Sequence, residues 1–225
     1  AALENRGHIT IGVTSQFGLR ALTEIIPRFK SVYPDYRVEI TEQGLPSITR
    51  MLLEENLDLG LMAANSTDPF PEDTVDLLQN EEVLFAIPAS HPYAKENPSG
   101  RISRKDLMNI FKNENFLLSR KESTLRVLSD SMFASCHFEP SAMCETNSVT
   151  ATRRMVASGI GVTFIGKTCV SSSDPVAYYS LEPSLFRLNL LVRRKNWMPN
   201  PAEEYLCQLI RSCFPPAEDN ARKSP

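Results

Sequence analysis

The sequence predicts an α/β fold in which buried strands alternate with amphipathic helices. The first observation is the segment 9–33, where an apolar run rich in β-branched residues leads through a polar turn into a helical stripe. The second is that this order repeats at once, as a strand over 36–41, a helix over 45–52 and a strand over 57–62. A strand–helix–strand–helix–strand order is most simply satisfied by a parallel sheet.

The segment 9–33 predicts one half of a binding site. ITIGV at 9–13 is typical of a buried strand. Apolar residues spaced by three and four then mark one helical face, formed by Leu19, Leu22, Ile26, Phe29 and Tyr33. Thr14 and Ser15 lie between the strand and the helix. In an open parallel sheet this turn sits at the carboxyl end of the strand, where ligands bind and helix N–H groups are free.

The middle of the chain continues the same pattern. Pro34-Asp35 predicts the turn before the strand at 36–41, and Gly44 precedes a helix that tolerates Pro46 in its first turn. Residues 64–76 are predicted to form a surface loop because they are rich in Asn, Ser, Thr, Asp and Pro. We expect a strand over 81–88 and a polar loop over 91–103.

A second set of elements follows. A short strand at 115–118 and a polar turn at 119–124 lead into a helix with Leu125, Leu128 and Met132 on one face. A strand ends at 143–145, and Asn147-Ser148 is predicted to cap a helix that stops at Gly159. Further strands are expected at 161–165 and 186–192, the second reached through residues 175–179, and a terminal helix follows around 205–210. The first six residues are expected to end a linker, and the tail at 215–225 to be disordered.

Composition excludes several classes of function. The 225 residues suffice for one large or two medium domains. The formal net charge is −3, and there is no run of Lys and Arg, so this chain alone is not expected to bind a phosphate backbone. No apolar stretch approaches the ~18 residues of a membrane span, and the N-terminus shows no signal-peptide pattern.

Signals for catalysis or a metal are weak. Five cysteines with no CxxC pair argue against a disulfide framework and a structural zinc site. Cys136 and Cys144 leave a redox switch as a minor alternative. The three histidines are scattered, and there is neither a GxSxG elbow nor a P-loop. We therefore expect no enzyme activity, no cofactor and no metal.

Taken together, the motifs resemble the effector-binding domain of LysR-type transcriptional regulators. They are ITIGVTSQFGLRALTEIIPRFKSVYPDYRVEITEQG, LLEENLDLGLM, EEVLFAIPASHPYA, CETNSVTATRRMVASGIGVTFIGK and LNLLVRR, in the family's order between Gly7 and Phe214. The amino-terminal winged helix-turn-helix of the family is not in this sequence. Gly166 departs from the pattern, because the family often has proline there.

The resemblance implies a type II periplasmic-binding-protein-like fold with two Rossmann-like subdomains joined by two crossover strands. The subdomains would comprise 7–82 with 183–214, and 83–182. It further implies a cytoplasmic protein that forms a homodimer or homotetramer. It would contact DNA only through the missing amino-terminal domain, and it would not associate with a membrane.

Polar turns before three helices are the expected effector site. Each helix amino terminus presents about half a positive charge and free N–H donors, so a small organic acid or another anion is the expected effector. Taken singly, Ser15, Ser123 and Asn147 are each better explained as helix caps. Taken together at the family's site positions, they predict binding as well. With the positions that the resemblance adds, the candidates are Thr14, Ser15, Asn65, Ser119, Arg120, Ser123, Thr124, Asn147, Ser148 and Val149.

Three classes of function fit this fold. A ligand-sensing regulatory domain is favoured, in which cleft closure reorients DNA-binding domains. The runner-up is a free-standing solute-binding protein of a transporter, which an export signal would support. The third is an enzyme on the same fold, but Ser15 has no base partner that the sequence identifies.

Overall fold

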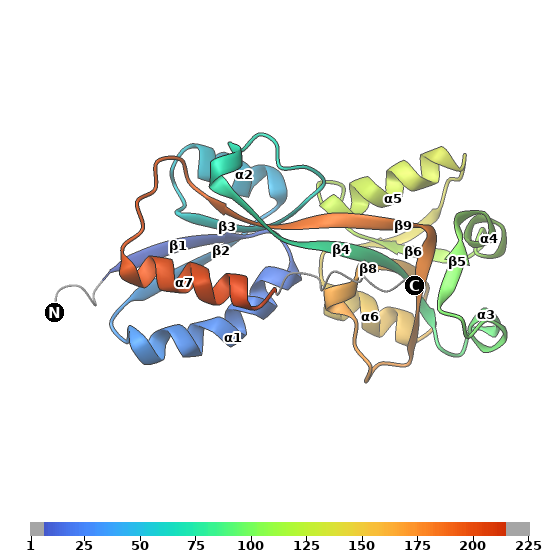
Figure 1. The fold of residues 1–225 in the computed structure, drawn as a ribbon. Coiled ribbons are helices and arrows are strands. Elements are labelled where there is room, and N and C mark those ends of the chain that lie inside the picture. Colours follow the sequence, from blue (N-terminus) through green and yellow to red (C-terminus); the bar gives the residue numbers. More distant parts are fainter. Residues whose placement is uncertain (1–6, 215–225) are drawn as a thin grey trace, which may run out of the picture.

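Two long strands run from one end of the molecule to the other, and shorter strands and helices gather at both ends (Figure 1). The computed structural model describes residues 7–214, so the predicted linker end at 1–6 and tail at 215–225 lie outside the described residues. The strands are β1 (His8–Val13), β2 (Arg37–Glu42), β3 (Leu59–Ala64), β4 (Val75–Pro88), β5 (Arg101–Ser103), β6 (Asn115–Leu118), β7 (Ser141–Glu145), β8 (Val162–Gly166) and β9 (Val176–Arg193). The helices are α1 (Gln16–Val32), α2 (Leu45–Leu53), α3 (Pro92–Glu96), α4 (Arg104–Ile110), α5 (Thr124–Ser135), α6 (Val149–Ala157) and α7 (Pro201–Ser212), with 3-10 turns η1 (Glu72–Thr74) and η2 (Lys167–Cys169).

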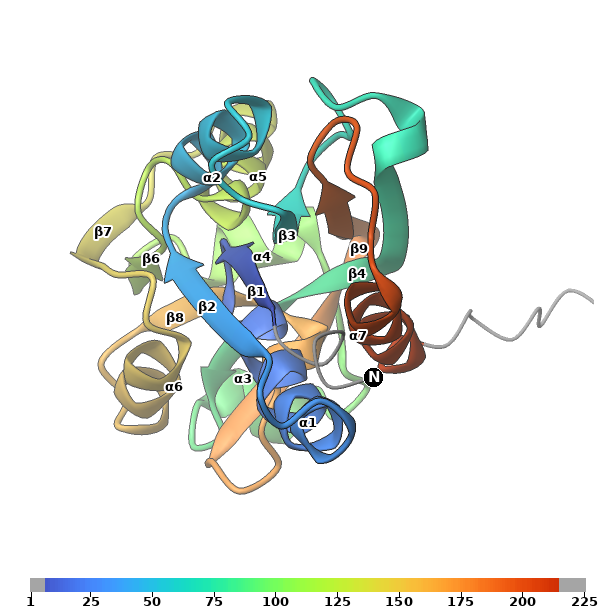
Figure 2. The same ribbon diagram turned by 90° about the vertical axis from the view of Figure 1, so that its left-hand side faces the viewer.

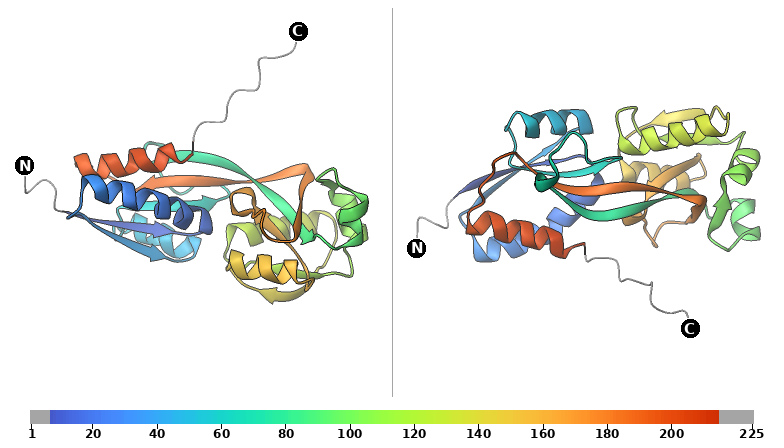
Figure 3. Two further views of the ribbon diagram at one scale, coloured as in Figure 1. Left: turned by 90° about the horizontal axis from the view of Figure 1, so that it is seen from below. Right: turned by 45° about the horizontal axis from the view of Figure 1, so that its top comes forward.

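These strands are linked in the order β2-β1-β3-β9-β4-β8-β6-β7, with β5 beside β9. Strands β1, β2 and β3 are parallel, and so are β6, β7 and β8. Strand β9 runs antiparallel to β3 and β4, and β4 runs antiparallel to β8. Figure 3 shows β4 and β9 passing together between the halves. The predicted fold class is confirmed: two α/β halves joined by two crossover strands. The subdomain boundaries stay a prediction.

Each half has its own apolar core. In the first half, α1 and α7 cover one face of β1–β3 and α2 covers the other, as Figure 2 shows. In the second half, rings from β4, β8, α5 and the loop after α5 meet around Phe116 of β6, which is fully buried. Both halves therefore bury one sheet between helical layers, and the crossover strands are the backbone connection between them.

Helix α1 confirms the predicted helix, but its buried face is turned by about one residue. Leu22 and Phe29 are buried as predicted, and Ile25 is buried between them. Leu19, Ile26 and Tyr33 are only partly buried at the edge of the core. Helix α7 packs on α1 and widens the contact beyond a single stripe.

Strand β4 begins at Val75, whereas the sequence predicted a strand only from residue 81. The pairing of β4 with β9 is irregular between Leu77 and Gln79. A bulge adds a residue on one strand and so interrupts the alternation of apolar and polar side chains. The first half of this crossover strand was missed for that reason.

The predicted polar loop over 91–103 is wrong. Residues 92–96 form α3, residues 101–103 form β5, and α4 follows directly. The His91 ring accepts a hydrogen bond from the Tyr93 N–H at 3.1 Å and caps α3. Helix α3 and strand β5 are both shorter than the window of residues in which a periodic pattern can be recognised.

Strand β9 begins at Val176, whereas the sequence predicted a strand only over 186–192. Its pairing with β4 skips residues 181–184, because Val83 pairs with Leu185 and the next residue, Leu84, pairs with Ser180. Leu181 and Glu182 pair with β5 instead. The skipped residues thus mark a change of neighbour within one strand.

Candidate functional site

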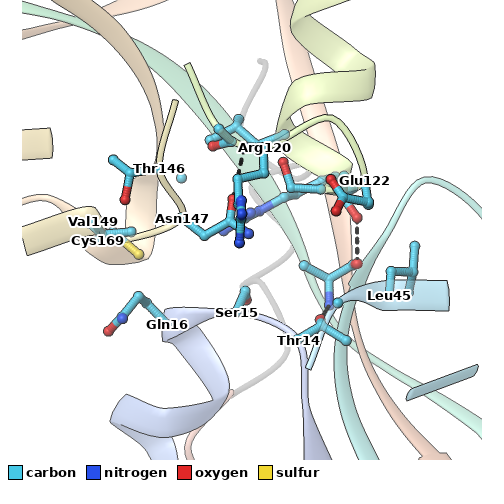
Figure 4. Close-up of a pocket in the computed structure, with 18 of the residues that line it drawn as sticks. Thr14, Ser15, Gln16, Leu45, Arg120, Glu122, Thr146, Asn147, Val149 and Cys169 are labelled. Atoms are coloured by element: carbon cyan, nitrogen blue, oxygen red, sulfur yellow. Dashed lines mark hydrogen bonds between the residues drawn. The ribbon is translucent and has the colours of Figure 1, made fainter. Parts of the chain in front are cut away.

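A cavity of about 330 Å³ lies between the two halves. This volume falls within the roughly 300–1,000 Å³ that is usual for small-ligand sites. Figure 4 shows Thr14 and Ser15 on one side of it and Arg120 and Asn147 on the other. The side chains and backbone that line it belong to Thr14, Ser15, Gln16, Gln43, Gly44, Leu45, Pro46, Ser47, Ala63, Ser119, Arg120, Glu122, Ser123, Thr124, Leu125, Thr146, Asn147, Val149, Thr152, Thr163, Phe164, Ile165, Gly166, Cys169 and Arg187.

The turn after β1 is fixed by its neighbour β3. The Thr14 N–H donates to the Leu61 carbonyl at 3.1 Å, and the Thr14 hydroxyl accepts from the Ala63 N–H at 2.9 Å. Ser15 occupies the N-cap position of α1, but its side chain makes no capping hydrogen bond. Its Oγ is buried without a hydrogen-bond partner among residues 7–214. Capping alone therefore does not explain Ser15, and this hydroxyl is available to a ligand.

The opposite wall is held by side-chain caps. Ser123 accepts from the Arg126 N–H at 3.1 Å at the start of α5, and Ser148 accepts from the Ala151 N–H at 3.3 Å at the start of α6. Asn147 does not cap α6 as predicted. Its Oδ1 instead accepts a hydrogen bond from the Arg120 N–H at 3.0 Å. The bond fixes the loop before α5 against the loop before α6.

A fourth helix amino terminus, that of α2, reaches the cavity through Gly44, Leu45, Pro46 and Ser47. This strand-to-helix turn was predicted from the sequence but was not among the expected site residues. The signal was present, because β2 is parallel to β1 and its carboxyl end meets the same edge of the sheet. Four helix amino ends thus converge on one cavity.

The structure brings eight of the ten predicted site residues to the cavity wall. They are Thr14, Ser15, Ser119, Arg120, Ser123, Thr124, Asn147 and Val149. Asn65 is exposed just after β3 and is outside this lining, as is Ser148, which caps α6.

A direct hydrogen bond at the cavity wall joins the two halves. The Thr124 hydroxyl donates to the Ala63 carbonyl at 2.6 Å, and Thr124 is buried. A second bridge lies nearby, where Arg20 of α1 donates to the Thr168 carbonyl at 2.6 Å. The two halves are therefore joined by at least two hydrogen bonds.

The crossover strands place a buried ion pair against the cavity. Arg187 Nε donates to Glu81 Oε2 at 2.7 Å, and the two residues face each other in the β4–β9 ladder. Glu81 also accepts from the N–H and hydroxyl of Thr168 and from the Asn189 amide. Burial acts to raise the Glu81 pKa, but the Arg187 charge and these hydrogen bonds outweigh it and hold the pKa below its ordinary value of 4.5.

This pair was not predicted from the sequence. Its signal was the two glutamates that open the apolar run EEVLFAIP and the single arginine inside FRLNLLV. A charged residue is seldom fully buried unless it is paired.

This lowered pKa predicts an acid-dependent loss of stability. A carboxyl with a depressed folded pKa contributes stability in full above its unfolded pKa and loses it as the pH falls through the folded value. We expect the stability difference between wild type and Glu81→Gln to be largest above pH 4.5 and to shrink at lower pH. Urea unfolding at several pH values measures this difference. Glu42→Gln, at an exposed position, is the control and should show little dependence. A difference that stays constant with pH would contradict the assignment.

Metal-ligating and redox side chains are dispersed. Within residues 7–214 no group of three His, Cys, Asp or Glu residues could hold a metal ion. The five cysteines are free, and burial raises the pKa of the Cys169 thiol that lines the cavity. None of the helices in the same residues is long and apolar enough to cross a membrane.

The chain matches the sequence model of the LysR substrate binding domain over residues 2–213. It is 24% identical over 170 residues, 74% of this chain and 53% of the relative, to a "Probable RuBisCO transcriptional regulator" of Trieres chinensis. The chain spans about half the length of the curated relatives that it matches.

Solved structures share the fold. The effector binding domain of QuiR in complex with shikimate has a TM-score of 0.69 at 23% identity, over 93% of this chain and 97% of that one. The BenM effector binding domain with its effector benzoate has a TM-score of 0.66 at 24% identity, over 92% of both chains.

Proposed function

Since the chain belongs to the LysR substrate binding domain family, we propose that the cavity between its halves binds a small anionic effector. The observation that carries this proposal is the convergence of four helix amino ends on one cavity. Those ends carry partial positive charge, and their free N–H groups are directed toward the ligand space. The unpartnered Ser15 hydroxyl adds a donor and acceptor there.

The charges of the cavity wall also favour an acid. Arg120 lines the cavity and forms no ion pair among residues 7–214. Glu122 is the acidic side chain in the lining, and it would disfavour a ligand with several negative charges. QuiR and BenM were solved with shikimate and benzoate, which are both monocarboxylic acids. A small monocarboxylate is therefore the effector class that we propose for this chain.

Binding would act on the relative arrangement of the halves, with residues 7–82 and 183–214 moving against residues 83–182. The Thr124–Ala63 and Arg20–Thr168 hydrogen bonds join these parts beside the ligand space. A ligand shifts such an equilibrium only by its difference in affinity for the two arrangements. In a full-length regulator this shift would be passed, through a homodimer or homotetramer, to a DNA-binding domain.

Ser15→Trp provides the test of this function. The wild-type domain is heated with benzoate, shikimate, amino acids, inorganic anions and neutral benzamide. A ligand at ~100 times its dissociation constant adds roughly 2.7 kcal/mol. For a chain of this size we expect a rise in melting temperature of about 5–10 °C. An indole at position 15 would fill the cavity, so the rise should disappear in Ser15→Trp while the ligand-free melting temperature stays nearly unchanged.

Ser99→Trp is the matched control, because Ser99 is exposed in a loop outside the cavity. Its response to the ligand should equal that of wild type. Stabilisation that persists in Ser15→Trp would place the ligand elsewhere. A collapse of the ligand-free variant would show that Ser15 is chiefly structural.

A further inference from the structure

Arg187 is a buried cation with free hydrogen-bonding capacity at the cavity. Its residue is 6% exposed, and it lies in the lining. A guanidinium group has five N–H donors in a fixed planar arrangement. Among residues 7–214 its side chain makes one hydrogen bond, from Nε to Glu81. Its Nη1 and Nη2 atoms form none with the described residues, and neither belongs to the fully buried atoms that lack a partner there, so both can be reached from the cavity.

Glu81 does not use up the charge of Arg187. Four hydrogen bonds reach its carboxylate, and three of them come from Thr168 and Asn189. These neutral donors stabilise the carboxylate independently of Arg187. The ion pair therefore orients the guanidinium through Nε and leaves its other edge to a second acceptor.

Gly166 provides the space in which this arrangement fits. A Cβ atom at residue 166 would lie 2.5 Å from Arg187 Nη2 and 2.5 Å from Glu81 Oε1. Gly166 also belongs to the cavity lining. A side chain here, including the proline that the resembled family often has, would displace the ion pair or close the route to Nη2.

We infer that Arg187 recognises the acidic group of the effector, with its Nη1 and Nη2 N–H groups donating to a carboxylate or a similar oxyanion. This inference rests on the proposed function and assigns the charge-recognising residue of that site. An arginine fork matches the two oxygens of a carboxylate, and charge-assisted hydrogen bonds are about twice as strong as neutral ones. Arg120, another arginine of the cavity lining, is exposed, and water weakens the attraction of an exposed charge.

The test compares charged and neutral probes of the same shape. Acetate and benzoate are titrated into ¹⁵N-labelled domain, with acetamide and benzamide as neutral partners. In wild type, the acids should shift the Arg187 Nε–H signal and the Gly166 amide signal, and the amides should not. In the double variant Glu81→Gln/Arg187→Met, the dissociation constants of the acids should rise about tenfold or more, and those of the amides should change little.

The double variant is designed to fold. The glutamine that Glu81→Gln introduces can still accept from Thr168, and its amide can donate to Asn189 Oδ1, which has no partner among the described residues. The double variant leaves the net charge unchanged. Arg154→Met removes an exposed arginine of α6 outside the cavity lining and is the control for the loss of an arginine away from the cavity. It should bind the acids as wild type does.

Arg187→Lys keeps the charge but loses the planar fork, so its affinity for the acids should lie between those of wild type and double variant. Equal affinity for acetate and benzoate in wild type and double variant would overturn the role of Arg187. Wild-type signals of Arg187 that do not move with either acid would overturn it as well. If these signals move but no compound in the thermal panel is sensitive to Ser15→Trp, the anion site stands and the proposed function fails.

Discussion

Replacing Phe116 by alanine is expected to destabilise the domain by about 3–5 kcal/mol. The ring is fully buried in the second half. Its centroid lies 5.3 Å from that of Phe133 and 5.8 Å from that of Phe138, both edge-on, and 6.4 Å from those of Phe85 and Phe164. Alanine would leave a cavity among rings held by two strands, a helix and the loop after that helix. Urea unfolding followed by circular dichroism measures the loss.

Phe186→Ala is the control of the same residue type, because Phe186 is 46% exposed on β9. Its effect should stay below about 1 kcal/mol. Similar losses for both variants would contradict the central position of Phe116 in the second core. A spectroscopic probe attached within β1–β3 would show whether the first half unfolds at the same urea concentration as the second.

Replacing Glu81 by leucine is expected to cost about 3–5 kcal/mol, because it leaves the Arg187 charge buried without its partner. Side-chain exposure is 0% for Glu81 and 7% for Arg187, so water can compensate little. Three donors from Thr168 and Asn189 lose their acceptor at the same time. The free energy of unfolding at pH 7, taken from urea titration, measures the effect.

The double variant Glu81→Leu/Arg187→Met should recover part of this loss, since it removes the uncompensated charge. Full recovery is not expected, because the donors of Thr168 and Asn189 remain without an acceptor. A single variant that costs less than about 1 kcal/mol would contradict the burial of the pair. A double variant less stable than Glu81→Leu would show that Arg187 stabilises the fold without Glu81.

Elements with a long repeat were predictable from the sequence. The β-branched run before Thr14 became β1, and the stripe containing Leu22 and Phe29 became α1, because burial on one face imposes the helical period on the sequence. The polar turns were equally visible, since hydroxyl residues at a strand-to-helix junction are also helix caps. The first half of β4 was not predicted, because a bulge interrupts its alternating pattern. Helix α3 and strand β5 were not predicted because they are too short to show a periodic signal.

The sequence by itself determined the α/β class, the resemblance to a family and the polar turns that reach the cavity. Each depends on residues that are neighbours in the chain, or three to four apart. The tertiary structure alone decided which of those turns meet, that α2 joins them, and that Ser15 keeps a free hydroxyl. It also decided that Glu81 and Arg187, 106 residues apart, form one buried pair. Such contacts depend on strand order and register, which no local pattern encodes.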